Sequence, residues 1–180
     1  MGIKEDSPGV PGKLPRPVEI LSHDGAIVLK QLIPQDAEEL FALIDRNREH
    51  LSQHGDDTAA KYPTLESVSD SIVTPKNPHR MRFAIRNAQG EVVGSINLTP
   101  DKDTSERGEI GYYLGSEFQG KGYAGRAVER LTEYAFQELG YETLFGEVAE
   151  GNNPSVKVLE GTGYRETGRN EGKIIFSKRK

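Results

Sequence analysis

Apolar residues recur at two spacings along the chain, and each spacing predicts a different kind of element. Met81, Phe83 and Ile85 alternate with other residues, as in a strand that buries one face. After Asp36, apolar residues instead recur every three or four positions, which places them on one side of a helix. Segments of both kinds follow, so the pattern predicts a domain that mixes strands with helices.

The order of these segments starts with neighbouring strands and ends with a strand–helix–strand unit. We expect strands at 27–33, 109–114 and 143–149, a hairpin over 81–98 that turns at 88–90, and a final strand pair at 164–168 and 173–177. We expect helices over 37–44, 65–73 and 154–161, and a long one that follows the glycines after residue 114 and stops before Gly140. Residues 52–64 are polar and are expected to form a loop. The predicted fold class is α/β (α+β).

Composition limits the function classes that remain. The chain has 180 residues and no cysteine, which excludes disulfide bonds, Cys-ligated metals and a thiol nucleophile. Its net charge of −5 argues against broad binding of nucleic acid and suits a cationic substrate or a basic partner. We find neither an apolar run of membrane-spanning length nor a secretory signal, and therefore expect a cytoplasmic protein with no membrane partner.

Prolines crowd the start of the chain, at positions 8, 11, 15 and 17. Such a stretch favours extended, poorly packed chain. We therefore expect residues 1–24 to form a mobile N-terminal arm and residues 25–180 to form a single domain.

A glycine-rich loop between a strand and the long helix carries the strongest chemical signal. Gly120, Gly122 and Gly125 lie beside two cationic residues, Lys121 and Arg126. The first N–H groups of a helix have no partner within the helix, and the helix dipole makes this end a site for phosphate. A plain turn and helix start is the simpler interpretation. The loop lacks the Walker A pattern, but its glycines do match the G-x-G-x-x-G spacing, which leaves a dinucleotide site as an alternative.

The motifs around this loop resemble those of a known family. Gln119-x-x-Gly122-x-Ala124 is similar to the Q/R-x-x-G-x-G/A loop of the GNAT superfamily of N-acetyltransferases. The preceding strand 109–114 (Glu-Ile-Gly-Tyr-Tyr-Leu) and the later segment 152–164, with its Asn-Asn-Pro-Ser start and Gly-Tyr end, resemble the ribosomal-protein N-acetyltransferase (RimJ/RimL-like) branch. The resemblance implies a mixed, mostly antiparallel central sheet with helices on both faces. It also implies that the parallel strands 109–114 and 143–149 splay apart.

The resemblance implies acetyl-coenzyme A as co-substrate and assigns residues to it. Loop amides would hold its pyrophosphate, at Gln119, Gly120, Lys121, Gly122, Tyr123, Ala124 and Gly125. Main-chain groups of Tyr113 and Leu114 would pair with the pantetheine arm, and the Leu114 N–H would face the thioester oxygen. Asn152 would contact the arm, and the Ser155 hydroxyl would lie near the sulfur.

The chemistry of acetyl transfer to an amine also calls for a base and a proton donor. A primary amine attacks only when neutral, so a base must remove its proton. Glu147 and Glu109 are the candidates, because burial in an apolar strand would raise the pKa of either carboxyl. Glu147, just upstream of the Asn motif, is preferred. Some relatives use a Tyr as acid where this chain has Leu159, so Ser155 becomes the expected donor.

Other candidates have simpler explanations. His50 and His54 have i, i+4 spacing, but the zincin motif would need Glu at position 51, so we expect no metal site. Residues 48–64 are expected to line the acceptor pocket. The tyrosines 112, 113, 123 and 134 are expected to be core or pocket wall.

The sequence thus predicts an enzyme that transfers acetyl directly to a primary amine in a ternary complex, as a monomer or homodimer. A protein N-terminal α-amine is the first expected acceptor, and aminoglycosides or polyamines come next. An acyl-coenzyme A sensor or scaffold without transfer activity, and a dinucleotide-binding protein, are the alternatives.

Overall fold

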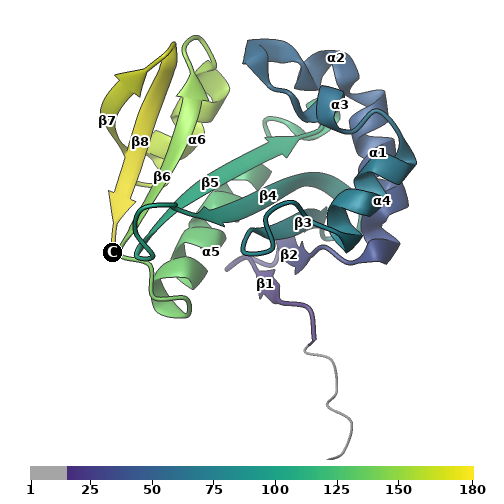
Figure 1. Cartoon of the computed structure of the whole chain (residues 1–180), viewed down its shortest axis with the longest axis horizontal. Coiled ribbons are helices and arrows are strands. Elements are labelled where there is room, and N and C mark those ends of the chain that lie inside the picture. The colour runs from purple at the N-terminus through teal and green to yellow at the C-terminus, as the bar shows by residue number, and fades with distance from the viewer. Residues whose placement is uncertain (1–15) are drawn as a thin grey trace, which may run out of the picture.

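The computed structural model describes residues 16–180, which form one eight-stranded sheet with helices on both faces (Figure 1). The strands are β1 (Glu19–Leu21), β2 (Ile27–Gln31), β3 (Met81–Asn87), β4 (Val92–Pro100), β5 (Arg107–Leu114), β6 (Thr143–Ala149), β7 (Arg165–Asn170) and β8 (Lys173–Arg179). The helices are α1 (Ala37–Arg46), α2 (Arg48–Leu51), α3 (Thr58–Lys61), α4 (Leu65–Val73), α5 (Tyr123–Gln137) and α6 (Asn153–Gly161). The predicted fold class is confirmed.

The strand order is β1-β2-β3-β4-β5-β6-β8-β7. Neighbours pair antiparallel except β5 and β6, which are parallel and are joined through α5. The predicted hairpin over 81–98 is present as β3 and β4. Because parallel pairing is confined to β5 and β6 among the described strands, the sheet lacks the run of parallel strands of a dinucleotide-binding fold, and that alternative loses its structural basis.

One face of the sheet is apolar and carries the part of the core that packs against α5. Side chains of Phe83, Ile85 and Ile96 on this face are fully buried. Helix α5 packs on it through Ala127, Val128, Leu131 and Ala135, which are also fully buried. Burying such side chains stabilises the fold by about 1.5–3 kcal/mol each. Helix α6 contacts both α5 and β6 and so extends this layer.

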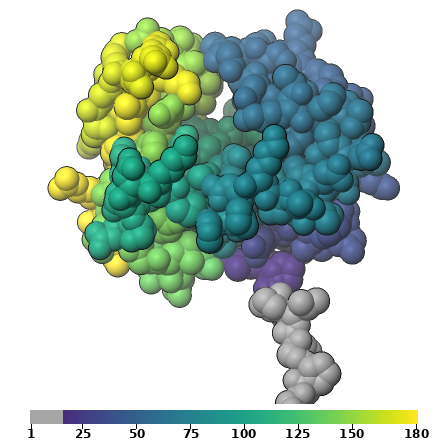
Figure 2. Space-filling view, viewed as in Figure 1, coloured from purple at the N-terminus to yellow at the C-terminus, as the bar shows by residue number. Residues whose placement is uncertain are grey.

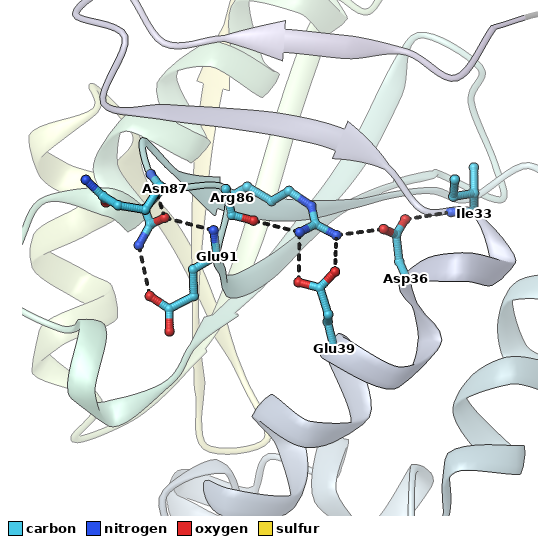
Figure 3. Close-up of polar contacts among 8 residues, drawn as sticks. Ile33, Asp36, Glu39, Arg86, Asn87 and Glu91 are labelled. Atoms are coloured by element: carbon cyan, nitrogen blue, oxygen red, sulfur yellow. Dashed lines mark hydrogen bonds and ion pairs between the residues drawn. The ribbon is translucent and has the colours of Figure 1, made fainter.

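The other face is more polar, and α1 and α4 cover its β3–β4 half. A buried ion pair fixes α1 there (Figure 3). The Arg86 guanidinium, on β3, donates to Asp36 Oδ1 at 2.8 Å and to both oxygens of Glu39 at 2.9 and 3.0 Å. Asp36 also accepts from the Ile33 amide at 2.9 Å. The hydrogen bond with Glu39 raises the pKa of Arg86, and the cluster ties the start of α1 to the sheet.

Two expectations about the N-terminal half were wrong. Glu19–Leu21 pairs with β2 as strand β1, so the part of the predicted arm from residue 19 belongs to the sheet. Residues 1–15 lie outside the described residues. The predicted loop 52–64 contains the short helix α3 and a 3-10 turn over Gln53–Gly55. Its polar composition concealed these turns because only Ala59 of α3 is buried.

Candidate active site

Strands β5 and β6 separate soon after they meet. Their pairing covers Arg107–Glu109 against Thr143–Phe145, although β5 continues to Leu114 and β6 to Ala149. Beyond this point the two ribbons diverge, and a wedge-shaped gap opens between them (Figure 1). We call this gap the wedge. The separation expected from the resemblance is therefore present in the described residues.

Main-chain groups of β5 point into the wedge at every second residue. The Gly115 amide donates to Val93 O at 3.0 Å, so odd-numbered residues of this stretch direct their main-chain groups toward β4. A Cβ on Gly94 of β4 would lie 2.2 Å from Tyr113 O, which places that carbonyl against β4. The N–H and C=O of Tyr112 and Leu114 consequently face the wedge. The main-chain groups of Tyr113, which were expected to face the gap, point toward β4 instead, whereas those of Leu114 and of Tyr112 face the wedge.

The glycine loop lies between the end of β5 and α5 and is open to solvent. Residues 119–122 are exposed. Gly120 and Gly122 have φ of +73° and +75°, a conformation that side chains other than glycine adopt at a cost. Gly122 is the N-cap of α5, and no side chain caps this helix end. The amides at the start of α5, from Tyr123 to Gly125, therefore remain available to an anion.

The two cations of the loop are held near it. Lys121 Nζ lies 5.5 Å from the centre of the Phe118 ring. Arg126 donates through Nη1 to Lys121 O at 3.2 Å and through Nε to Asp24 Oδ2 at 2.6 Å. Hydrogen bonds from the Ala26 amide, Arg126 and Ser22 lower the pKa of Asp24 to about 2. This role of Asp24 was not expected, because Asp24 belongs to the segment that was predicted to be a mobile arm.

Helices α1 and α2 brace the loop from the other side. Buried Asn47 accepts through Oδ1 from the amide and the hydroxyl of Ser116, both at 2.9 Å. His50 Nε2 lies 3.1 Å from Gln119 Nε2. His54 has φ of +56°, so the chain leaves the helix before it and the two histidines do not share a helical face. Among the described residues, no three His, Asp or Glu side chains are grouped to hold a metal ion.

The start of α6 borders the wedge on the β6 side. Asn152 caps this helix by accepting from the Ser155 amide at 3.3 Å. The Tyr112 hydroxyl donates to Ser155 O at 3.3 Å, so this side chain bridges β5 and α6 where the main chains have parted. Burial raises the pKa of Tyr112 to about 12, which keeps the phenol protonated. The sequence placed Tyr112 only in a wall, and its bridging contact was missed.

The two candidate bases differ in their surroundings. Glu109 lies at the vertex of the wedge, opposite Phe145, and is half-buried. Burial and then the charge of Glu147 raise the pKa of Glu109. Glu147 is exposed and accepts from Lys173 Nζ at 3.0 Å, so the burial expected of it is absent. Leu159, at the position where the resemblance implies a tyrosine acid in some relatives, is buried against Gly146.

The wedge opens into a hollow in the molecular surface. Figure 2 shows this hollow between the C-terminal strands and the helices α2 and α3. Hydrogen bonding with Glu147 raises the pKa of Lys173 on one wall, and the charge of Asp57, beside α3, adds to this shift. The segment that holds α2 and α3 borders the hollow (Figure 2).

Residues 26–165 match the Acetyltransferase (GNAT) domain. The chain belongs to the GNAT acetyltransferase family. It is accordingly an enzyme of the N-acetyltransferase type, and the wedge and glycine loop are its candidate active site. None of the helices in the described part of the chain has the length and apolar character to cross a membrane.

The relatives of this GNAT domain carry names that refer to different amine substrates. YdaF of Bacillus subtilis (strain 168), named as a candidate ribosomal N-acetyltransferase, is 31% identical over 79% of this chain and 80% of its own. A spermidine N(1)-acetyltransferase of Vibrio cholerae is 26% identical over 69% of this chain and 71% of its own. RimL, described as a ribosomal L7/L12 alpha-N-protein acetyltransferase in complex with coenzyme A, has a TM-score of 0.79, 16% identity, and coverage of 89% and 98%. The RimL likeness shows the fold alone.

Proposed function

We propose that this enzyme transfers acetyl from acetyl-coenzyme A to a primary amine, by direct attack within a ternary complex. One observation carries the proposal: an uncapped helix start with two left-handed glycines lies beside a wedge that exposes main-chain donors. The helix start supplies a diphosphate site, and the wedge supplies a slot for an extended arm that ends in a thioester.

The residues present fit the co-substrate along its length. The amides of 119–125 would hold the pyrophosphate, with Lys121 and Arg126 adding positive charge. The pantetheine arm would lie against the free main-chain groups of Tyr112 and Leu114. Asn152 and Ser155, at the start of α6, would border the arm from the β6 side.

The Leu114 amide is the proposed oxyanion donor. As the amine attacks the thioester carbon, the carbonyl oxygen gains negative charge. A main-chain N–H fixed by the β4–β5 ladder needs no reorganisation to stabilise that charge. The carbon–sulfur bond then breaks, and the sulfur leaves as a thiolate that takes up a proton. Ser155 is the proposed donor of this proton, and its hydroxyl is restored by the second proton that the attacking nitrogen releases as the amide forms.

Glu109 is the proposed base. An α-amine titrates near pH 8 and is mostly protonated at neutral pH, so it must lose a proton before attack. Glu109 lies at the vertex, five residues before Leu114, and would take the proton through intervening water. Its raised pKa makes it a stronger base than an ordinary carboxylate. Glu147, which the sequence favoured, is here a second negative charge that helps to raise the Glu109 pKa.

A protein N-terminal α-amine is the proposed acceptor. The hollow is open to the surface beside α2 and α3, which suits the end of a polypeptide, and the name of YdaF points to a ribosomal acceptor. The second candidate is a polyamine, which the relation to a spermidine acetyltransferase favours.

Mass spectrometry tests the proposal. Acetyl-coenzyme A is incubated with the enzyme and a library of peptides and small amines, and thiol release is followed in parallel. Peptides that gain one acetyl group at the α-amine, with equal thiol release, would support it. Tight binding of acetyl-coenzyme A with no amine-dependent thiol release would overturn it and favour a sensor without transfer activity.

A further inference from the structure

A cationic groove runs across the sheet beside the wedge. It has a volume of about 640 Å³, and its lining includes Arg107, Thr143, Arg165, Thr167, Ser177 and Arg179. Lys178 also lines it, but its ammonium donates to Thr162 O at 2.7 Å. A cluster of arginines is unexpected on a chain whose net charge is −5.

Strand register places these side chains on the same face as the proposed base. Glu109 pairs with Phe145, Phe145 with Ser177, and Ser177 with Arg165. Residues that pair directly point to the same side of a sheet, so Glu109 and Arg165 share the polar face.

The neighbouring row repeats this arrangement. Arg107 pairs with Thr143, and Thr143 with Arg179. With strands about 4.8 Å apart, Arg165 is about 14 Å from Glu109, and Arg179 is about 10 Å from Arg107. The row of arginines thus starts at Arg107, two residues from Glu109 on β5, and continues away from Glu109 onto β8 and β7.

Two of the three arginines are free to bind. Arg165 and Arg179 are exposed, and neither has a carboxylate oxygen within 4.0 Å among residues 16–180. Arg107 pairs with Asp101 at 3.2 Å and stacks over Phe145, with its guanidinium carbon 4.1 Å from the ring centre. The Thr167 and Ser177 hydroxyls, 2.9 Å apart, add donors between them.

We propose that this groove binds acidic side chains of an acceptor polypeptide, downstream of the α-amine that is acetylated. The inference rests on the proposed function. An extended peptide advances about 3.3 Å per residue. Its amine would lie at the thioester beside Leu114, five residues or about 16 Å along β5 from Glu109, so positions 6–8 come within reach of the arginines. The cations are few, and the Asp101 carboxylate lies 3.2 Å from Arg107, which suits a short acidic segment better than a polyanionic nucleic acid.

The test compares two acceptor peptides that differ only in carrying glutamate or glutamine at positions 6–8. Exposed ion pairs contribute little each, so the groove is expected to give a roughly five- to tenfold higher kcat/KM for the acidic peptide, and less at high salt. The double variant Arg165→Gln, Arg179→Gln should reduce this ratio to below about twofold. Arg169→Gln is the matched control, because this exposed β7 arginine does not line the groove and pairs with Glu150 and Glu166.

Equal kcat/KM for the two peptides, or a ratio that survives in the double variant, would overturn the inference. The inference would also be overturned if the two peptides gave equal rates while a short single-stranded RNA bound tightly to the unsubstituted enzyme and not to the double variant. Peptide affinity is also measured by fluorescence anisotropy with coenzyme A present. A charge preference in binding without acetylation would uphold the groove while contradicting the proposed acceptor.

Discussion

At the scale of single residues, the site depends on what surrounds each carboxylate. Glu109 and Glu147 have similar sequence contexts, and the sequence favoured Glu147. The structure separates them, because Lys173 reaches only Glu147 by a hydrogen bond and Glu109 is the one that is half-buried. A cross-strand ion pair depends on the register of β6 against β8, which a one-dimensional pattern does not contain.

Glu109→Gln should therefore lower kcat by about 100-fold at neutral pH, with little change in acetyl-coenzyme A affinity. In the unsubstituted enzyme, kcat/KM should fall as the pH drops through the raised Glu109 pKa, and the variant should lose this limb of the profile. Glu147→Gln is the comparison and should retain most activity while shifting that limb to lower pH. A large loss in Glu147→Gln with a mild effect of Glu109→Gln would reverse the two roles.

The raised pKa of Glu109 also affects the stability of the fold. A carboxyl whose pKa is raised on folding favours the fold when protonated, and this contribution is lost as the pH rises through the folded-state pKa. Glu109→Gln should accordingly raise Tm at neutral pH, and the gain should disappear below about pH 4.5, the ordinary value for glutamate. A scan of Tm against pH for both proteins checks this, and an unchanged or lower Tm at neutral pH would contradict it.

Gly122 allows a second residue-scale test. Gly122→Asp would add strain at a φ of +75° and bring negative charge to the proposed diphosphate site, so acetyl-coenzyme A affinity should fall at least about 100-fold. Gly90→Asp is matched, since Gly90 has φ of +80° with open space around it but lies in the β3–β4 turn. Calorimetric titration should show an affinity loss for position 122 alone. Similar affinity in both variants would count against the loop assignment.

At the scale of elements, the sequence predicted most of the secondary structure. Helix α4 and strand β6 have the predicted bounds, because strong periodicity and flanking Pro75 or Gly140 define them. Strand β1 was missed because three residues carry too little pattern, and its partner β2 supplies the hydrogen bonds that hold it. The main-chain alternation along β5 was likewise beyond the sequence, since it depends on register with β4.

The Arg86 cluster should be the main polar anchor of α1. Arg86→Met would leave Asp36, whose side chain is 11% exposed, without its cation, and should lower the free energy of unfolding by about 3 kcal/mol. The control Arg169→Met removes a half-exposed arginine and should cost less than about 1 kcal/mol. Urea unfolding measures both. Equal losses of unfolding free energy in the two variants would show that the stabilising contribution of the Arg86 cluster does not depend on its burial.

At the scale of the whole molecule, the fold places three features at one end of the sheet. The wedge exposes donors from β5, the glycine loop presents the start of α5, and the hollow leads in from α2 and α3. Asn47, the His50–Gln119 contact and the Asp24–Arg126 pair join distant segments to the loop. Each of these contacts joins residues more than 60 positions apart in the sequence. The glycine motif therefore predicted the loop, but it could not predict the residues that hold the loop in place.

Backbone amide NMR with increasing acetyl-coenzyme A tests the central claim most directly. The account predicts the largest shifts at the amides of Tyr112 and Leu114 in the wedge and of residues 120–125 in the loop and first turn of α5. Saturating co-substrate that leaves these amides unmoved and shifts signals elsewhere in the chain would contradict it.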